Sequence, residues 1–447
     1  MTKNNSINRR HFLTGSGAVL AAGSLSSGRA VAATPSANYA LTPVLDTVDV
    51  LVVGGGPAGI AAMLAAQGQG VKCLLVESYS FFGGSAVWGL GKPMEQMRLA
   101  SKPRSVIHEK LLKHLTDLGS QAARLEGANV HPNVHFLKAA IVDALDEAKC
   151  SYYVHVQAAD AVVEGKRVTG VILATKQGLK RVNAKVVLDC TGDASIVSLA
   201  GAATLSEGSA SAPMALSAAY IDMDVPSVKT SDITQAFDRA RGKYPLLPKT
   251  VKGLEQVSTS GFGTMNHSGT SGFGSFDPLD PKQRSEAECK SRRQVLQMEH
   301  AMRASSTKAL QDIDICEGAP QVCVPLPRRV KGVYTLTQQD VANGASFPDT
   351  IALRHDKVND GHTRCGIPYR AMIPERLDGI LNAGSGISAA RGAVSTAAGN
   401  CMATGHAAGL AAALSVKQGI MPRELKVTEI QDALRKDEVD LIMGGKV

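Results

Sequence analysis

The sequence predicts an α/β protein with a Rossmann-like domain, a parallel central sheet and a three-stranded β-meander insert. Two observations predict this class. An apolar strand at 48–53 leads directly into a glycine-rich turn and a helix, followed by a second strand and an acidic residue. Three short strands separated by turns follow at 151–188. The length of 447 residues allows two or three domains, some of them discontinuous.

The first 32 residues resemble an export signal. Arg9 and Arg10 precede Phe-Leu, a weakly apolar run covers 14–25, and the small residues Ala-Val-Ala stand at 30–32. The adjacent arginines resemble a signal read by the twin-arginine translocase, which exports folded proteins. We therefore expect a periplasmic or secreted protein that acquires a cofactor before export. No stable membrane insertion is expected, because no run of eighteen apolar residues follows.

Charge and cysteine spacing limit the other functions. The net charge is +8, but four of the basic residues lie in residues 1–32, and the remainder has no basic run, so no nucleic-acid partner is expected. The eight cysteines lack metal-ligand spacing, so no metal site is predicted. Cys316 and Cys323 could pair after export, and buried or free thiols are the alternative.

The glycine-rich turn follows the first strand, after a linker at 33–47. Its sequence, Gly54-Gly55-Gly56-Pro57-Ala58-Gly59, satisfies GxGxxG. Gly54 allows a tight turn, Gly56 lets the backbone approach a pyrophosphate, and Gly59 lets the helix pack closely on the strand. Pro57 and Ala58 begin that helix, whose unpaired N–H groups would face the phosphates.

The second strand, 71–76, ends at Glu77 and Ser78. An acidic residue at this position accepts a hydrogen bond from a ribose hydroxyl in dinucleotide-binding folds. Taken together, strand, turn, helix, strand and acid predict a dinucleotide site, although GxGxxG alone does not separate NAD from FAD.

The next segment favours FAD. Phe81-Phe82-Gly83-Gly84-Ser85 resembles the double-glycine stretch of FAD-dependent oxidoreductases in the two-dinucleotide-fold and fumarate-reductase-like superfamily. In that family the stretch follows the ribose acid and runs past the pyrophosphate toward the flavin. The resemblance implies non-covalent FAD, with Gly83, Gly84 and Ser85 among its contacts.

Two later motifs resemble the same family. Three strands at about 151–163, 167–175 and 181–188 end in Thr191-Gly192-Asp193, similar to the family's (A/C)TGD turn beside the cofactor. We interpret Asp193 as a loop anchor rather than a catalytic acid. An apolar strand also ends in Ala383-Gly384, which the resemblance places near the ribityl phosphate.

The segment Gly405-His406-Ala407-Ala408-Gly409 resembles the family's closing helix. The resemblance implies a helix that opens here and points its N-terminus at the flavin pyrimidine, with Gly405 and Ala407 as cofactor contacts. Such an end would favour the negative charge of reduced flavin. A tight helix crossing that requires small residues is a compatible interpretation.

The resemblance covers about 48–435 and implies a discontinuously inserted α+β substrate or cap domain, with a helix at about 281–312. The expected limits are 1–32 for the signal, 33–47 for the linker, 48–204 and 363–425 for the FAD-binding domain, 205–362 for the cap, and 426–447 for a C-terminal helix or tail. The chain departs from the family in two places. An arginine is missing before Arg328-Arg329, and another is missing from 395–401.

Four residues are candidates for catalysis. Arg329 could bind a substrate carboxylate or stabilise an anion, whereas His355, Tyr369 and His406 could transfer protons. Arg328, Arg354, Arg364, Arg391 and His362 are further candidates by location.

The predicted function is an exported FAD-dependent oxidoreductase that transfers a hydride between a small organic substrate and flavin N5. No second GxGxxG unit is visible, so the expected electron partner is a quinone or a periplasmic cytochrome. Reduction of an activated alkene and oxidation of a C–H or alcohol both remain open. The alternative is a non-catalytic flavoprotein that serves as an electron-transfer or binding subunit.

Overall fold

A computed structural model describes most of the chain downstream of the expected signal. The described residues are 39–90, 93–99, 102–206, 216–221, 228–248, 254–256, 263–266, 276–322, 324, 328–358 and 361–441. The expected signal at 1–32 lies outside this part, as does Cys323, so the Cys316–Cys323 pair is not described. Within the described part, no helix combines the length and the apolar character needed to cross a membrane.

A seven-stranded sheet forms the main domain, in the order β7-β2-β1-β10-β9-β8 with β19 also pairing β10. The pairs β1–β2, β1–β10, β2–β7 and β10–β19 are parallel, whereas β8, β9 and the first half of β10 form an antiparallel meander. The predicted parallel sheet and meander are therefore confirmed. The strands are β1 (Val44–Val53), β2 (Cys73–Val76), β7 (Ser151–Tyr153), β8 (Gln157–Glu164), β9 (Arg167–Thr175), β10 (Gly178–Asp189) and β19 (Ile380–Asn382).

Two strands differ from the sequence prediction. The first begins at Val44, so its start falls in the expected linker. The stretch predicted as one strand at 151–163 is divided, because His155 has a left-handed φ of 57° that an extended strand does not allow. Its first piece, β7, extends the parallel sheet, and only β8 joins the meander.

Two helices of small residues cross closely in the core of this domain. Helix α1 (Pro57–Gly68) is buried along Ala58–Ala66, and α9 (Ala398–Gln418) is buried over most of its length. A β-carbon on Gly405 would lie 2.0 Å from the Ala58 carbonyl oxygen, and one on Gly409 would lie 2.3 Å from the Ala62 oxygen. The crossing therefore requires glycine, as one sequence interpretation expected.

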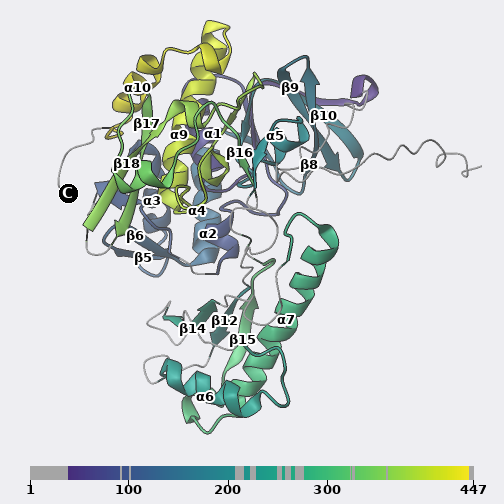
Figure 1. Cartoon of the computed structure of the whole chain (residues 1–447), viewed down its shortest axis with the longest axis vertical. Helices are drawn as coiled ribbons and strands as arrows, with labels where there is room; N and C mark the ends of the chain where they lie inside the picture. Colours follow the sequence, from purple (N-terminus) through teal and green to yellow (C-terminus); the bar gives the residue numbers. More distant parts are fainter. Residues whose placement is uncertain are drawn as a thin grey trace, which may run out of the picture. The chain divides into compact units, whose positions relative to one another are not determined.

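A second region has its own apolar core, formed by residues such as Phe237, Met298 and Leu310. Its four-stranded sheet has the order β13-β14-β12-β15, and Figure 1 labels β12, β14 and β15 of this sheet together with helices α6 and α7. The elements are β12 (Ser217–Ile221), α6 (Thr230–Ala240), β13 (Leu254–Gln256), β14 (Gly263–Asn266), α7 (Pro281–Arg303) and β15 (Asp314–Gly318). Helix α7 ends nine residues before the predicted end at 312, and a 3₁₀ turn follows at Lys308–Leu310.

The chain returns to the main domain earlier than expected. Strands β17 (Thr350–Val358) and β18 (Gly361–Pro368) form a hairpin, and Ile351 and Ala352 belong to the apolar core of the main domain. The expected boundary at 362 therefore falls inside this hairpin. Earlier in the chain, strand β16 (Arg329–Val330) pairs with β11 (Thr204–Leu205), which follows the first part of the main domain.

Further helices, strands and 3₁₀ turns complete the described part of the chain. They are η1 (Tyr39–Leu41), α2 (Ser85–Trp88), β3 (Arg98–Leu99), β4 (Lys102–Pro103), α3 (Val106–Asp117), β5 (Ala123–Glu126), β6 (Asn129–Pro132), α4 (Val134–Glu147), α5 (Ser195–Leu199), α8 (Gln338–Ala342), η5 (Tyr369–Ala371), η6 (Gly384–Gly386), η7 (Pro422–Glu424) and α10 (Val427–Lys436).

Candidate functional site

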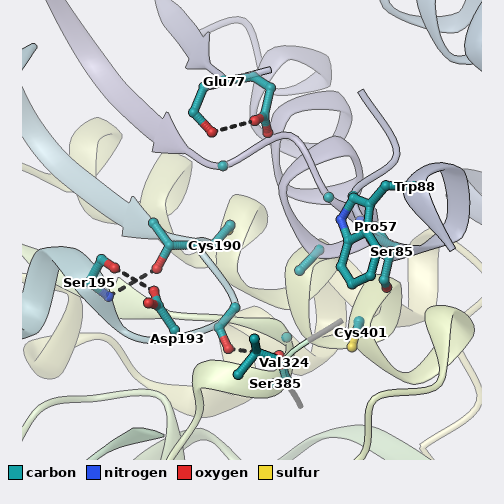
Figure 2. A pocket seen from close by; sticks show the side chains of 18 of the residues that line it. Pro57, Glu77, Ser85, Trp88, Cys190, Asp193, Ser195, Val324, Ser385 and Cys401 are labelled. Atoms are coloured by element: carbon teal, nitrogen blue, oxygen red, sulfur yellow. Dashed lines mark hydrogen bonds between the residues drawn. The ribbon is translucent and has the colours of Figure 1, made fainter. Parts of the chain in front are cut away.

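A cavity of about 870 Å³ opens where four parallel strands end. Gly54, Glu77, Cys190 and Ala383 each follow the last residue of β1, β2, β10 and β19, and all four line it. Ligands of open α/β sheets bind at this carboxyl edge, and the volume lies in the range of small-molecule sites. Figure 2 draws the side chains that surround the cavity.

The three motif glycines of the glycine-rich turn have different structural roles. Gly54 has φ +100°, and a β-carbon there would lie 2.6 Å from the Cys190 carbonyl oxygen. Gly59 packs the helix on the turn, because its β-carbon would lie 1.8 Å from the Gly54 oxygen, and Gly59 does not line the cavity. Gly56 has an ordinary φ of −74°.

Gly56 leaves space for a ligand. The nearest atom to a β-carbon built on Gly56 is the Gly84 Cα at 3.9 Å, so nothing in the protein itself forbids a side chain there. Gly56, Pro57 and Ala58 line the cavity at the N-terminus of α1, where unpaired N–H groups and the helix dipole favour a phosphate.

Glu77 holds the turn in shape. Its Oε2 atom accepts a hydrogen bond from the Gly55 N–H at 2.7 Å, and its Oε1 atom accepts from the Ser78 hydroxyl and the Tyr79 N–H, both at 2.9 Å. A carboxylate has about four acceptor positions, so one remains after these three bonds. Glu77 and Ser78 both line the cavity, where that position could accept from a ribose hydroxyl.

The double glycine follows the same strand. Gly83 and Gly84 have φ of +111° and +50°, and the Gly83 N–H donates to the Gly55 oxygen at 2.8 Å. Gly84 and Ser85 line the cavity at the start of α2, whereas Gly83 lies behind them against Val87. This stretch therefore lines the cavity directly beside Gly56.

The Thr-Gly-Asp turn forms another wall. The Ser385 hydroxyl donates to the Gly192 oxygen at 3.0 Å, and Asp193 accepts from the Ser195 hydroxyl, as Figure 2 shows. Asp193 also pairs with Arg328 at 3.3 Å, so the contacts of Asp193 anchor the loop. Gly192, Asp193 and Gly384 line the cavity, as does Arg328.

Asp189, which ends β10, was not predicted from the sequence. It is fully buried and accepts from the N–H groups of Ile196 and Val197 at the start of α5, at 2.9 and 3.0 Å. Burial raises the pKa of this carboxyl above its usual value. Asp189 therefore supports the turn from behind.

Helix α9 begins seven residues earlier than the resemblance implied. It starts at Ala398, so its first turn, and not Gly405, reaches the cavity. Gly405 and Ala407 are buried in the crossing with α1 and do not line the cavity, so their expected cofactor contacts are not supported. Cys401 does line it, and burial raises the pKa of its thiol to about 12.

None of the four candidate catalytic residues lines the cavity. Arg329 is buried and donates from Nε to the Ala389 oxygen at 2.7 Å, and the Tyr369 hydroxyl donates to the Pro422 oxygen at 2.9 Å. His355 and His406 are buried beside a separate small cavity, and His406 lies 2.7 Å from Asp437. The structure therefore places all four residues away from this cavity, and their catalytic role stays a prediction.

The sequence prediction missed the residues that close the rest of the cavity. From the second region these are Pro278, Leu279, Arg284, Gln321, Val322 and Val324. The Arg284 guanidinium donates to the Gln321 side-chain oxygen at 3.1 Å, and the Tyr79 hydroxyl bonds the same oxygen. Trp88, Pro93, Glu95 and Thr396 line the cavity from the main domain.

The cavity fits FAD, the expected cofactor. Glu77 and Ser78 mark the adenosine end, because they stand where dinucleotide folds bind the ribose. The glycine cradle of Gly56 and Gly84 would hold the pyrophosphate at the start of α1. The flavin would then extend toward the first turn of α9, where Trp88 lines the wall.

Comparisons with known proteins agree with this fit. A family model described as FAD dependent oxidoreductase matches residues 49–434. Thiamine thiazole synthases of Methanococcus vannielii and Methanococcus aeolicus are 29% identical over 160 residues and 30% identical over 158. These matches cover 34% and 33% of this chain, and 59% and 57% of the relatives, so less than two thirds of their length is spanned.

Solved structures that match this chain share little sequence with it. A geranylgeranyl bacteriochlorophyll reductase-like protein of Thermoplasma acidophilum is 13% identical, with 88% of this chain and 84% of that chain covered and a TM-score of 0.49. A flavoprotein/dehydrogenase of Cytophaga hutchinsonii is 14% identical, with 87% and 83% covered and a TM-score of 0.45. The family model, which matches most of the chain, carries the assignment: the chain belongs to the FAD-dependent oxidoreductase family and is an enzyme with FAD as its cofactor.

Proposed function

We propose that this enzyme transfers a hydride between a small organic substrate and flavin N5, and exchanges electrons with an external carrier. One observation supports this most. The second region supplies part of the cavity wall, with Leu279, Val322 and Val324 among its residues. A cofactor site closed by an inserted domain leaves room for a substrate between the two.

The residues of the chain have distinct parts in this proposal. Bound flavin supplies the redox chemistry. Trp88 and the apolar side chains of the second region line the cavity and would exclude water from a substrate bound there. Glu95 and Thr396 place polar side chains on the main-domain wall of the cavity, and a carboxylate oxygen of Glu95 would hold or accept a substrate proton.

A substrate screen tests the proposal. Purified holoprotein is mixed without oxygen with small alcohols, acids and other C–H donors, and flavin absorbance is followed. A donor that bleaches the flavin at a rate fast enough for catalysis supports the proposal. After chemical reduction, activated alkenes are screened for reoxidation in the same way. If neither set reacts with the flavin, hydride transfer with a small substrate is wrong.

The external carrier is tested separately. We propose a quinone or a periplasmic cytochrome as the electron partner. Chemically reduced holoprotein should reoxidise faster with a soluble quinone or a c-type cytochrome than with NAD⁺ or NADP⁺. Faster reaction with a nicotinamide would contradict this choice and would make the carrier a diffusible dinucleotide.

We also propose that the twin-arginine translocase exports the folded, FAD-loaded protein to the periplasm. The support is the sequence at 8–32. Changing Arg9 and Arg10 together to Lys should leave the precursor in the cytoplasm, because Lys lacks the planar guanidinium. Fractionation of cells that express each form checks this, and equal export of the double variant would refute it.

A further inference from the structure

A buried arginine lies behind the first turn of α9. Arg104 stands between β4 and α3 and is only 6% exposed. Its Nη1 atom donates to the Asn400 side-chain oxygen at 2.8 Å and to the Gln96 carbonyl oxygen at 3.1 Å, and Nη2 donates to the Leu353 oxygen at 2.5 Å. Arg104 is therefore fixed by three neutral acceptors.

Its charge has no carboxylate partner in the described part of the chain. Two nearby acids pair with other groups: Asp437 lies 2.7 Å from His406, and Asp440 lies 3.7 Å from Arg364, a second cation whose charge acts on Arg104. Both acids are partly exposed, so water screens them. Burial lowers the pKa of Arg104 to about 9, which leaves the guanidinium protonated at pH 7.

The neighbouring histidine adds no second charge. Burial lowers the pKa of His108 to about 3, so the ring is neutral at pH 7. Its Nε2 atom lies 3.1 Å from the Gly399 carbonyl oxygen, which can only accept, and its Nδ1 atom lies 2.8 Å from the Ser105 hydroxyl. His108 and Arg104 thus both hold the first turn of α9, but only Arg104 is cationic.

That turn lines the end of the cavity where the flavin would lie. Ala398 and Cys401 line the cavity, whereas Gly399 and Asn400 face the buried cluster. The positive charge of Arg104 also interacts with the Cys401 thiol, which it favours in the ionised form. No basic side chain occurs within 395–401 itself, so Arg104 supplies a positive charge from behind the turn.

We propose that Arg104 is a positioning residue whose buried charge, together with the N-terminus of α9, raises the reduction potential of the bound flavin. A fixed positive charge in a poorly screened interior stabilises the negative charge that flavin gains when it accepts a hydride. The inference depends on FAD in the cavity and not on the identity of the substrate, so a failed substrate screen leaves it intact.

The test measures the two-electron midpoint potential of purified holoprotein against redox dyes. Arg104→Gln keeps hydrogen-bond donors but removes the charge. We expect the equilibrium to shift at least tenfold toward oxidised flavin, which corresponds to a potential about 30 mV lower. Arg124→Gln removes the same charge from the exposed strand β5 and should leave the potential unchanged.

A second pair of variants decides the matter if Arg104→Gln does not fold. Asn400→Asp places a negative charge against Arg104 and should lower the potential, whereas Asn400→Ala disturbs the same hydrogen bonds without a charge and should not. An unchanged potential in Asn400→Asp, or an equal decrease in both Asn400 variants, would overturn the proposal. Loss of FAD from every variant would also overturn it, because Arg104 would then serve folding alone.

Discussion

The two halves of helix α9 show how the same small residues serve different purposes. Its first turn, at Ala398 and Cys401, faces the FAD cavity, whereas Gly405 and Gly409 in its middle face α1. A β-carbon on Gly405 would meet the backbone of Ala58, but one on Gly56 of the glycine-rich turn would meet no protein atom closer than 3.9 Å. Packing therefore requires glycine at position 405, whereas at position 56 only a bound ligand would require it.

Gly405→Ala should have the largest effect and should act on folding. The added carbon would lie 2.0 Å from the Ala58 oxygen, so α1 and α9 must separate at a cost of about 1–3 kcal/mol of unfolding free energy or more. Gly68→Ala, at an exposed site on α1 with nothing within 4 Å, should be neutral or stabilise by up to about 1 kcal/mol. Denaturant unfolding of both variants compares them, and equal stability would contradict the packing role.

Gly56→Val should have the opposite profile, with an intact fold and weak cofactor binding. The backbone φ of −74° suits valine, so the strain expected of a left-handed glycine does not arise. The branched side chain would occupy the pyrophosphate path and lower FAD affinity at least a hundredfold, which is about 2.8 kcal/mol. FAD titration of apoprotein measures this. Stoichiometric FAD in the purified variant would show that the pyrophosphate lies elsewhere.

These two glycines also show what the sequence could predict. Strand, turn, helix and acid are close in sequence, so their arrangement follows from local patterns, and Gly54, Gly56 and Glu77 all line the cavity. The Gly405 motif predicts the start of a helix, because its glycines resemble a family motif. Nothing local distinguishes a glycine that admits a ligand from one that admits a neighbouring helix.

The positions of the candidate catalytic residues could not be predicted for a related reason. Arg328 and Arg329 are adjacent in a β-strand region, where successive side chains point to opposite sides. Arg328 lines the cavity and Arg329 is buried beneath Ala389. The sequence could not decide between them, because the choice depends on the register of β16 against β11. The wall from the second region was also unpredictable, since its residues come from distant segments.

Glu77→Gln should weaken FAD binding less than Gly56→Val. An amide keeps one oxygen acceptor but places an NH₂ group against donors such as the Gly55 N–H. Loss of the charge-assisted bonds should cost about 1–3 kcal/mol of FAD binding free energy. The same titration measures it, with Glu126→Gln on the exposed strand β5 as a control. A greater loss in Glu77→Gln than in Gly56→Val would reverse the assignment of the two contacts.

Replacing His108 should have the smallest effect on stability at neutral pH. Its effect on the free energy of unfolding should appear only when the pH is lowered. Because burial lowers its pKa to about 3 from an ordinary 6.5, the unfolded chain binds the proton first as pH falls. The stability that His108 contributes is therefore complete above pH 6.5 and is lost between pH 6.5 and 3, by at most about 1.4 kcal/mol per pH unit.

His108→Gln should remove that slope, as measured by denaturant unfolding at several pH values. His114→Gln, on the same helix but partly exposed, provides the matched control and should leave the slope in place. An unchanged slope in His108→Gln would mean that other groups govern the acid sensitivity.

The central claim is that this cavity holds one FAD without a covalent bond. Its most direct test is the flavin content of the purified protein, measured before and after acid precipitation. We predict a yellow protein with about one FAD per chain, all of it released into the supernatant. A colourless protein that takes up no FAD when loaded, or flavin that stays with the precipitate, would contradict the account.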